Sequence, residues 1–233
     1  MILGGARSGK SSMAERMARE MGGRVTFVAT AEAHDAEMRR RIEVHRLNRP
    51  TGWRTIEEPL DLARAIVAAC SGSDVVIVDC LTLWVSNHLC RLADQGSRQT
   101  AEGPDVCWEA WGRAETPPVD DARSGAPACP GRTREAGSPI SIDPRWPLAV
   151  ERLESELAGQ LGRVVEAARS EDATLLVVSN EVGLGLVPEG ALGRAYRDLL
   201  GAVNRRLAAE ADRVILMVAG LPLDVKRLAA EQE

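Results

Sequence analysis

The sequence is poor in aromatic residues, with five Trp, one Tyr and one Phe among 233 residues, so its core must be mainly aliphatic. It has no run of 18 apolar residues, which excludes a membrane-spanning helix. It also lacks an excess of positive charge, because 29 Lys and Arg against 34 Asp and Glu give a formal charge of −5. This balance excludes a protein that binds nucleic acid through global positive charge.

The five cysteines form no CxxC pair and no Cys/His ligand spacing. We therefore expect neither a disulfide framework nor a zinc site. The first residues contain no charged segment followed by a long apolar one, so we expect no secretory leader. A reducing cytoplasm is the predicted location.

Short apolar runs alternate with amphipathic segments along the chain, and its length favours one domain over residues 1–233 with an appendage. Apolar runs without alternation are typical of strands buried on both faces of a parallel sheet. The pattern therefore predicts an α/β fold with a mostly parallel, doubly wound sheet. We expect strands at 25–29, 75–78, 175–178 and 214–218, and helices at 12–21, 35–47, 60–70, 148–170 and 192–211.

Residues 91–147 have a different composition from the rest of the chain. This stretch of 57 residues contains eight of the twelve prolines and only five Val, Leu, Ile, Met or Phe residues. Such a segment buries too little apolar surface to offset the entropy of ordering it. We expect a disordered, Pro-rich insertion, with a lid over the site as the alternative.

The clearest chemical signal is a phosphate-binding loop of the form G-x-x-x-x-G-K-[ST] ahead of a predicted helix. Its glycines let consecutive backbone N–H groups point at one anion, and the helix presents its positive end to it. We expect Lys10 to reach the β- and γ-phosphates and the Ser11 hydroxyl to bind Mg²⁺. The predicted nucleotide-binding residues of the loop are Gly4, Gly5, Ala6, Arg7, Ser8, Gly9, Lys10 and Ser11.

A phosphate loop usually has a partner acid at the end of a second buried strand. Asp79 follows the run 75–78 and is the predicted second Mg²⁺ ligand. The alternative is a helix N-cap ahead of Leu81.

Several further blocks are distinctive: GGARSGKS at 4–11, ATAE at 29–32, R-I-x-x-H at 41–45, GWRTIEEP at 52–59, DCLTLWVSN at 79–87, SNEVG at 179–183, YRDL at 196–199, Asn204 and GLPL at 220–223. Together these blocks resemble the adenosylcobinamide kinase / adenosylcobinamide-phosphate guanylyltransferase family. They occur in the family's order and span residues 1–90 and about 148–226. Two features depart from its pattern: the short first strand and the long insertion.

The resemblance implies a cytoplasmic enzyme of cobalamin biosynthesis with two successive activities. The first phosphorylates adenosylcobinamide with a nucleoside triphosphate, and ATP and GTP both remain open as the donor. The second transfers GMP from GTP onto the product through a guanylylated histidine, giving adenosylcobinamide-GDP. The resemblance also implies a RecA-like fold and a homotrimer.

His45 is the candidate for that histidine. Neutral imidazole is a competent nucleophile at phosphorus, and a phosphoramidate intermediate divides one displacement into two. The predicted helix around His45 is rich in arginines, which could hold a polyphosphate. Without the resemblance, a surface histidine on a solvated helix would be the simpler interpretation. The match of the R-I-x-x-H block favours the nucleophile instead.

The remaining assignments also rest on the resemblance. It makes Thr30, Ala31, Glu32 and Glu57 guanine-nucleotide contacts, three of which follow a strand, where α/β folds place ligand contacts. Glu181 follows the strand 175–178 and could orient Mg²⁺ or accept the proton of the attacking hydroxyl, with a strand-end cap as the alternative.

Two other functions stay open on the sequence. One is a RecA-like ATPase or nucleotide-dependent binding module, which the acidic chain without basic strand-binding loops disfavours. The other is a simple small-molecule kinase without nucleotidyl transfer, which would not need a histidine nucleophile.

Overall fold

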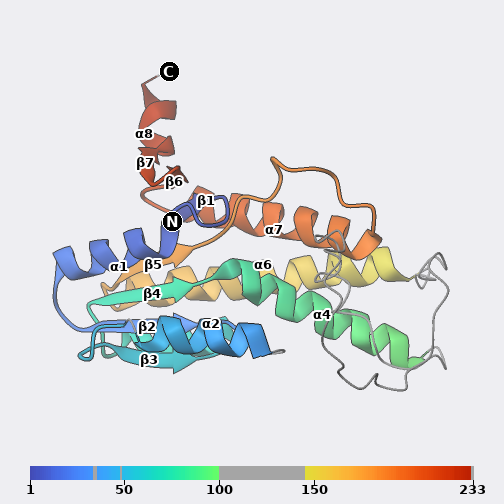
Figure 1. The fold of residues 1–233 in the computed structure, drawn as a ribbon, viewed down its shortest axis with the longest axis horizontal. Coiled ribbons are helices and arrows are strands. Elements are labelled where there is room, and N and C mark those ends of the chain that lie inside the picture. Colours follow the sequence, from blue (N-terminus) through green and yellow to red (C-terminus); the bar gives the residue numbers. More distant parts are fainter. Residues whose placement is uncertain (34–35, 48, 100–144, 232–233) are drawn as a thin grey trace, which may run out of the picture.

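A seven-stranded sheet forms the centre of the molecule (Figure 1). The computed structural model describes residues 1–33, 36–47, 49–99 and 145–231. The elements are β1 (Ile2–Gly4), α1 (Lys10–Met21), β2 (Val25–Ala29), α2 (Ala36–Leu47), β3 (Arg54–Glu57), α3 (Leu62–Cys70), β4 (Val75–Asp79), α4 (Leu81–Gln99), α6 (Trp146–Ser170), β5 (Thr174–Val178), α7 (Ala191–Glu210), β6 (Ile215–Val218), β7 (Leu221–Asp224) and α8 (Val225–Ala230).

The strand order is β3-β2-β4-β5-β1-β6-β7, and every neighbouring pair is parallel except β6 with β7. The mostly parallel α/β sheet is therefore confirmed. The central strands are apolar throughout because both faces are covered: all four residues Val75, Val76, Ile77 and Val78 are buried. β5 lies between β4 and β1, so the end of β4 and the start of the phosphate loop are separated by one strand.

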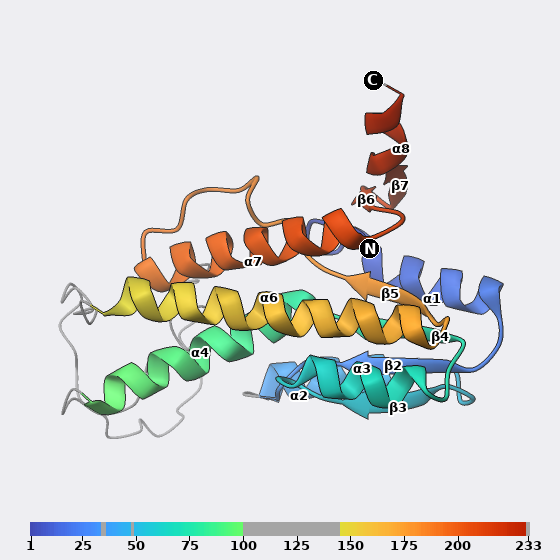
Figure 2. The same ribbon diagram turned by 180° about the vertical axis from the view of Figure 1, so that it is seen from behind.

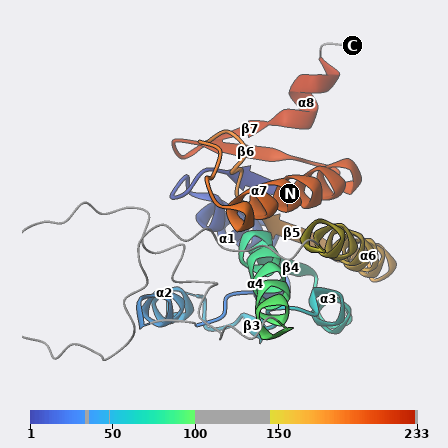
Figure 3. The same ribbon diagram turned by 90° about the vertical axis from the view of Figure 1, so that its right-hand side faces the viewer.

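Two apolar clusters lie on the two faces of the sheet. The larger cluster joins the sheet to α3, α4, α6 and α7, and its largest fully buried side chain is Trp84. The smaller cluster joins the other face to α1 through Ala14 and Ala18. An end-on view shows α1 and α2 on one side of the sheet and α3 and α6 on the other (Figure 3). The sheet is thus doubly wound, as predicted.

Two strands, β3 and β7, and two helices, α4 and α8, were not predicted from periodicity. β3 is an edge strand whose side chains are mostly exposed, so it carries no apolar run. β7 contains Pro222, and proline is tolerated on an edge strand where its nitrogen needs no partner. The hairpin β6–β7 and α8 project from the body of the molecule (Figures 1 and 2).

The predicted boundaries of the insertion are wrong at both ends. Residues 91–99 continue α4, and α6 begins at Trp146, inside the segment assigned to the insertion. Leu89 and Leu92 pack on the main core, which explains why the helix continues past residue 90. The rest of the expected insertion, 100–144, lies outside the described residues. Within the described part of the chain, none of the helices combines the length and apolarity that crossing a membrane would require.

The turn between β3 and α3 is held by one carboxylate, that of Glu58. It accepts hydrogen bonds from the backbone N–H groups of Leu60 (3.1 Å) and Asp61 (3.0 Å), and from Arg64 Nη2 (2.6 Å). Burial by itself would raise the pKa of Glu58, but these hydrogen bonds outweigh it and the pKa is lowered. Ionised Glu58 therefore stabilises the fold.

We expect Glu58→Gln to destabilise the protein by about 1–2 kcal/mol at neutral pH, since a charge-assisted acceptor is lost. Because the folded-state pKa of Glu58 is lowered, its contribution is present above the ordinary value of about 4.3 and is lost as the pH falls through the folded-state value. Urea unfolding of wild type and variant from pH 7 to pH 3 should show the gap closing in acid. A gap that stays constant with pH would contradict this role.

Candidate active site

The phosphate loop leaves β1 at Gly4 and returns into α1 at Lys10. Gly4 has φ +150°, and a Cβ there would lie 2.5 Å from the Met217 carbonyl oxygen and 2.7 Å from Ser8 Oγ. Only glycine fits such an approach. Gly9, which caps α1, has φ +92° in the left-handed region. Gly5, Ala6 and Arg7 form the solvent-exposed crest of the loop.

The ammonium of Lys10 lies inside this loop. Its Nζ donates a hydrogen bond to the Gly5 carbonyl oxygen (2.5 Å) and lies 3.5 Å from Ser8 Oγ. The residue is 8% exposed, and burial lowers the pKa of Lys10, an effect that Cys80 and Asp79 oppose. The loop's own carbonyl thus holds the cation at the place where a phosphate oxygen would bind.

Asp79 ends β4 beside this loop. Burial raises the pKa of Asp79, and a hydrogen bond from the Ser11 hydroxyl opposes the rise, as do electrostatic interactions with His45, Arg49 and Lys10. A hydroxyl and a carboxylate, the two predicted Mg²⁺ ligands, therefore contact each other at the start of α1. The same electrostatic effect places His45, in the last turn of α2, near Asp79.

Cys80 follows Asp79, and burial raises the pKa of its thiol to about 11. The thiol is protonated at neutral pH, so it has a packing role rather than a chemical one. The hydroxyl of Thr30 holds the Cys80 backbone on both sides, accepting from its N–H (2.8 Å) and donating to its carbonyl oxygen (2.7 Å). Thr30 is fully buried. Its side chain therefore positions the end of β4 and does not face solvent.

Glu32 and Glu57, the two acidic residues predicted to contact the nucleotide, lie at the same edge of the sheet but form ion pairs with different helices. Glu32 forms an ion pair with Arg91 Nη2 of α4 (2.9 Å), and Ala31 beside it is half-buried. Glu57, at the end of β3, is exposed and pairs loosely with Arg46 of α2 (3.9 Å). Glu57 therefore lies near the end of α2 that carries His45, whereas Glu32 is held by α4.

Glu181 lies directly beside the phosphate loop. Its backbone N–H donates to the Gly4 carbonyl oxygen (3.1 Å), and its Oε1 accepts from the Gly183 N–H (3.0 Å). The second contact is the strand-end cap that the sequence left open as an alternative. Oε2 makes no hydrogen bond with the residues that the structure describes.

Arg49 is a site residue that the sequence patterns gave no reason to select. Its guanidinium lies 3.9 Å above the centre of the Phe27 ring, and its buried Nε has no hydrogen-bond partner among the residues that the structure describes. Burial lowers the pKa of Arg49, whereas the charges of Asp79 and Glu57 raise it. No periodicity marks this residue, because its place depends on how the segment between α2 and β3 crosses the sheet.

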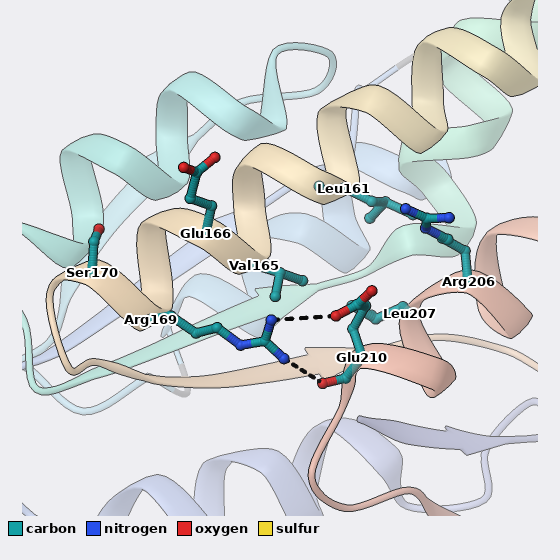
Figure 4. A pocket seen from close by; sticks show the side chains of 9 residues that line it. Leu161, Val165, Glu166, Arg169, Ser170, Arg206, Leu207 and Glu210 are labelled. Atoms are coloured by element: carbon teal, nitrogen blue, oxygen red, sulfur yellow. Dashed lines mark hydrogen bonds and ion pairs between the residues drawn. The ribbon is translucent and has the colours of Figure 1, made fainter.

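A hollow of about 500 Å³ lies between α6 and α7. Leu161, Val165 and Leu207 line it, and Arg169 reaches Glu210 across it through Nη1 to the carboxylate (3.3 Å) and Nη2 to the carbonyl oxygen (3.2 Å; Figure 4). Both helices end here, immediately before β5 and β6, so the hollow is at the amino edge of the sheet. The phosphate loop lies at the opposite, carboxyl edge, and this hollow is not part of the site.

Comparison with known proteins agrees with this geometry. Residues 1–225 match the family model described as cobinamide kinase / cobinamide phosphate guanyltransferase. The bifunctional adenosylcobalamin biosynthesis protein CobP of Pseudomonas aeruginosa is 37% identical over 226 residues, which cover 97% of this chain and 96% of the relative. The proteins named bifunctional adenosylcobalamin biosynthesis protein CobU in Escherichia coli and Salmonella typhimurium are 31% and 30% identical, over 97% of this chain and 98% of each relative.

Proposed function

The chain belongs to the cobinamide kinase / cobinamide phosphate guanyltransferase family, and from that premise we propose how its residues divide the two reactions. It is a bifunctional enzyme of adenosylcobalamin biosynthesis, a kinase and a guanylyltransferase. This activity replaces the two alternatives that the sequence left open. The observations that support the division are that Lys10 lies inside the loop, and that Asp79 bonds to Ser11 and interacts electrostatically with Lys10 and His45.

In our proposal the phosphate loop, residues 4–11, binds the triphosphate of both nucleotide substrates. The exposed crest offers backbone N–H groups to phosphate oxygens, and the Lys10 ammonium exchanges the Gly5 carbonyl for the β- and γ-phosphates. Supporting this, Lys10 is almost fully buried, and burial lowers its pKa while the nearby Cys80 and Asp79 oppose that effect. A buried cation without an ionised partner would be costly, and a bound anion repays that cost.

Ser11 and Asp79 would hold Mg²⁺. One hydroxyl and one carboxylate already in contact are hard oxygen donors, and Mg²⁺ is commonly bound by one or two carboxylates together with substrate phosphates and water. The donor set therefore fits this ion. When bound, Mg²⁺ would neutralise charge on the β- and γ-phosphates.

For the kinase step we propose an in-line transfer. The hydroxyl oxygen of adenosylcobinamide bonds to the γ-phosphorus as the bond to the β–γ bridging oxygen breaks, and the nucleoside diphosphate leaves with the electron pair. Glu181 would accept the hydroxyl proton through Oε2, since Oε1 is engaged with the Gly183 N–H. Lys10 stabilises the charge that develops on the leaving group.

For the second step we propose His45 as the nucleophile. An imidazole nitrogen bonds to the α-phosphorus of GTP and pyrophosphate leaves, and a phosphate oxygen of cobinamide phosphate then displaces the imidazole to give the GDP ester. The support is the position of His45 at the exposed end of α2, near Asp79 and the loop. Ala31, Glu32 and Glu57 would contact the guanine nucleotide, and Thr30 would hold the strand end beneath it.

We also propose that the enzyme works as a homotrimer in the cytoplasm, where its nucleotide substrates are found. The projecting C-terminal segment supports assembly, because Val218, Leu221 and Leu223 of the hairpin are 50%, 69% and 45% exposed. Burying such a surface between identical copies is favourable. Light scattering should give about three times the 25.1 kDa chain mass, and a monomer mass would contradict this assembly.

Incubation with α-³²P-GTP and Mg²⁺, followed by a denaturing gel, tests the proposed guanylyl transfer. We expect label on the protein that acid removes and alkali does not, since that stability is typical of a phosphoramidate. Added cobinamide phosphate should discharge the label into the GDP ester. Absence of protein label during productive turnover would contradict a covalent intermediate.

A further inference from the structure

β5 does not end where its regular pairing ends. Beyond Val178, the N–H of Ser179 donates to the Ile2 carbonyl oxygen (3.0 Å), and the N–H of Glu181 donates to the Gly4 carbonyl oxygen (3.1 Å). Alternate N–H groups that bond to one neighbour are the pattern of a parallel ladder. The chain therefore stays extended alongside β1 as far as the first glycine of the phosphate loop.

Side chains alternate along this extension, as they do in any strand. Leu176 and Val178 belong to the apolar cluster on the α1 face. Ser179 faces the other way, because its Oγ donates to Asn204 Oδ1 of α7 (2.7 Å). Asn180 is next in the alternation and shares the α1 face, which is the face of the phosphate loop.

The register places Asn180 beside the loop and two residues beyond the level of Asp79. Val178 is paired with Ile2 on one side and with Asp79 on the other. Two residues further along, Asn180 is therefore level with Gly4, and adjacent strands are about 4.8 Å apart. Asp79 bonds to Ser11 at the start of α1, so its carboxylate is on the same face.

The backbone of Asn180 is fixed on both sides, whereas its side chain is not engaged. Its N–H donates to Thr82 Oγ1 (2.9 Å), and its carbonyl oxygen accepts from Asn204 Nδ2 (2.9 Å). The side-chain amide makes no hydrogen bond with any described residue. A polar group on a rigid backbone, aimed at a site and without a partner, is suited to bind a ligand without a cost of reorganisation.

We propose that the Asn180 amide contacts the γ-phosphate of the bound nucleoside triphosphate, with Nδ2 donating to a non-bridging oxygen. The proposal rests on the phosphate-binding role proposed above for the loop. An amide suits this place because a second carboxylate beside Asp79 would repel the phosphate, whereas a neutral donor stabilises its charge. In the transfer described above, the negative charge on the non-bridging oxygens moves with the phosphoryl group. The amide hydrogen bond would stabilise that charge before and during the transfer.

Binding of tri- and diphosphates to Asn180→Ala tests this contact. We expect the affinity for the β,γ-imido analogues of ATP and GTP to fall about 10- to 100-fold, the effect of one hydrogen bond to a charged group, while ADP and GDP bind as to wild type. Calorimetry measures both, and kinase turnover should fall by a similar factor. The control is Thr174→Ala, which alters an exposed side chain at the opposite, amino end of the same strand and should leave both affinities unchanged.

Asn180→Asp keeps the shape of the side chain and guards against misfolding of the alanine variant. It should lose triphosphate affinity by at least as much, because its charge repels the phosphate. Equal losses for tri- and diphosphates, or no loss, would overturn the γ-phosphate contact. Failure of the loop assignment would look different, since Lys10→Ala would then also retain wild-type triphosphate affinity.

Discussion

Lys10→Ala should reduce both the kinase and the guanylyltransferase rates by 100-fold or more. The ammonium is almost fully buried in the loop, where it is the charge available to neutralise a triphosphate. One charge-assisted contact in such a partly dry site is worth about 2–4 kcal/mol, and about 2.7 kcal/mol corresponds to a factor of 100. Steady-state rates of both steps with saturating cobinamide substrate measure the loss.

The chain offers a matched control, because Lys226 is its other lysine. Lys226 Nζ also donates to backbone carbonyl oxygens, those of Ala209 and Ala211, but in the C-terminal part of the fold. Lys226→Ala should therefore leave both rates unchanged. Full kinase activity in Lys10→Ala would contradict the role of the loop.

His45→Asn should abolish guanylylation while the kinase step continues. Asparagine has similar reach but no nucleophilic ring nitrogen, so the covalent GMP adduct cannot form. The kinase step uses the substrate hydroxyl as its nucleophile and does not need this side chain. The variant should accumulate cobinamide phosphate, lose protein labelling from α-³²P-GTP and make no GDP ester.

His88→Asn provides the comparison, since His88 is the other histidine among the described residues. Its Nε2 lies 3.0 Å from the Leu60 carbonyl oxygen, and its ring packs edge-on against Trp84. We expect a less stable protein that still labels. Labelling in His45→Asn would show that another residue carries GMP. Loss of both steps with the fold retained would make His45 a shared binding residue, and the two-step mechanism would be wrong.

The sequence by itself determined the phosphate loop and most of the sheet. The loop is a local feature, since eight consecutive residues specify its conformation and the helix that follows. The buried strands could also be predicted from the sequence, because a strand covered on both faces is apolar along its length, as in β4. Asp79 was identified for the same reason, as the first polar residue after such a run.

The tertiary structure alone decided which strand ends become neighbours. Composition and periodicity report whether a residue is buried, but not the order of strands in a sheet, which depends on packing between distant segments. β3 was not predicted because it is an exposed edge strand. The insertion was predicted to begin too early, at residue 91, because Leu92 is buried only by long-range packing. Arg49 reaches Phe27 by a connection that no local pattern encodes.

Asn180 illustrates this division best. Its sequence places it after a buried strand beside Glu181, and an acid is the more obvious choice for catalysis. The strand order puts β5 between β4 and β1, and the ladder continues to Gly4, so Asn180 as well as Glu181 lies beside the phosphate loop. The physical reason is that alternation along a strand fixes which of its side chains share a face. Only the packed sheet fixes which other elements and residues lie next to that face.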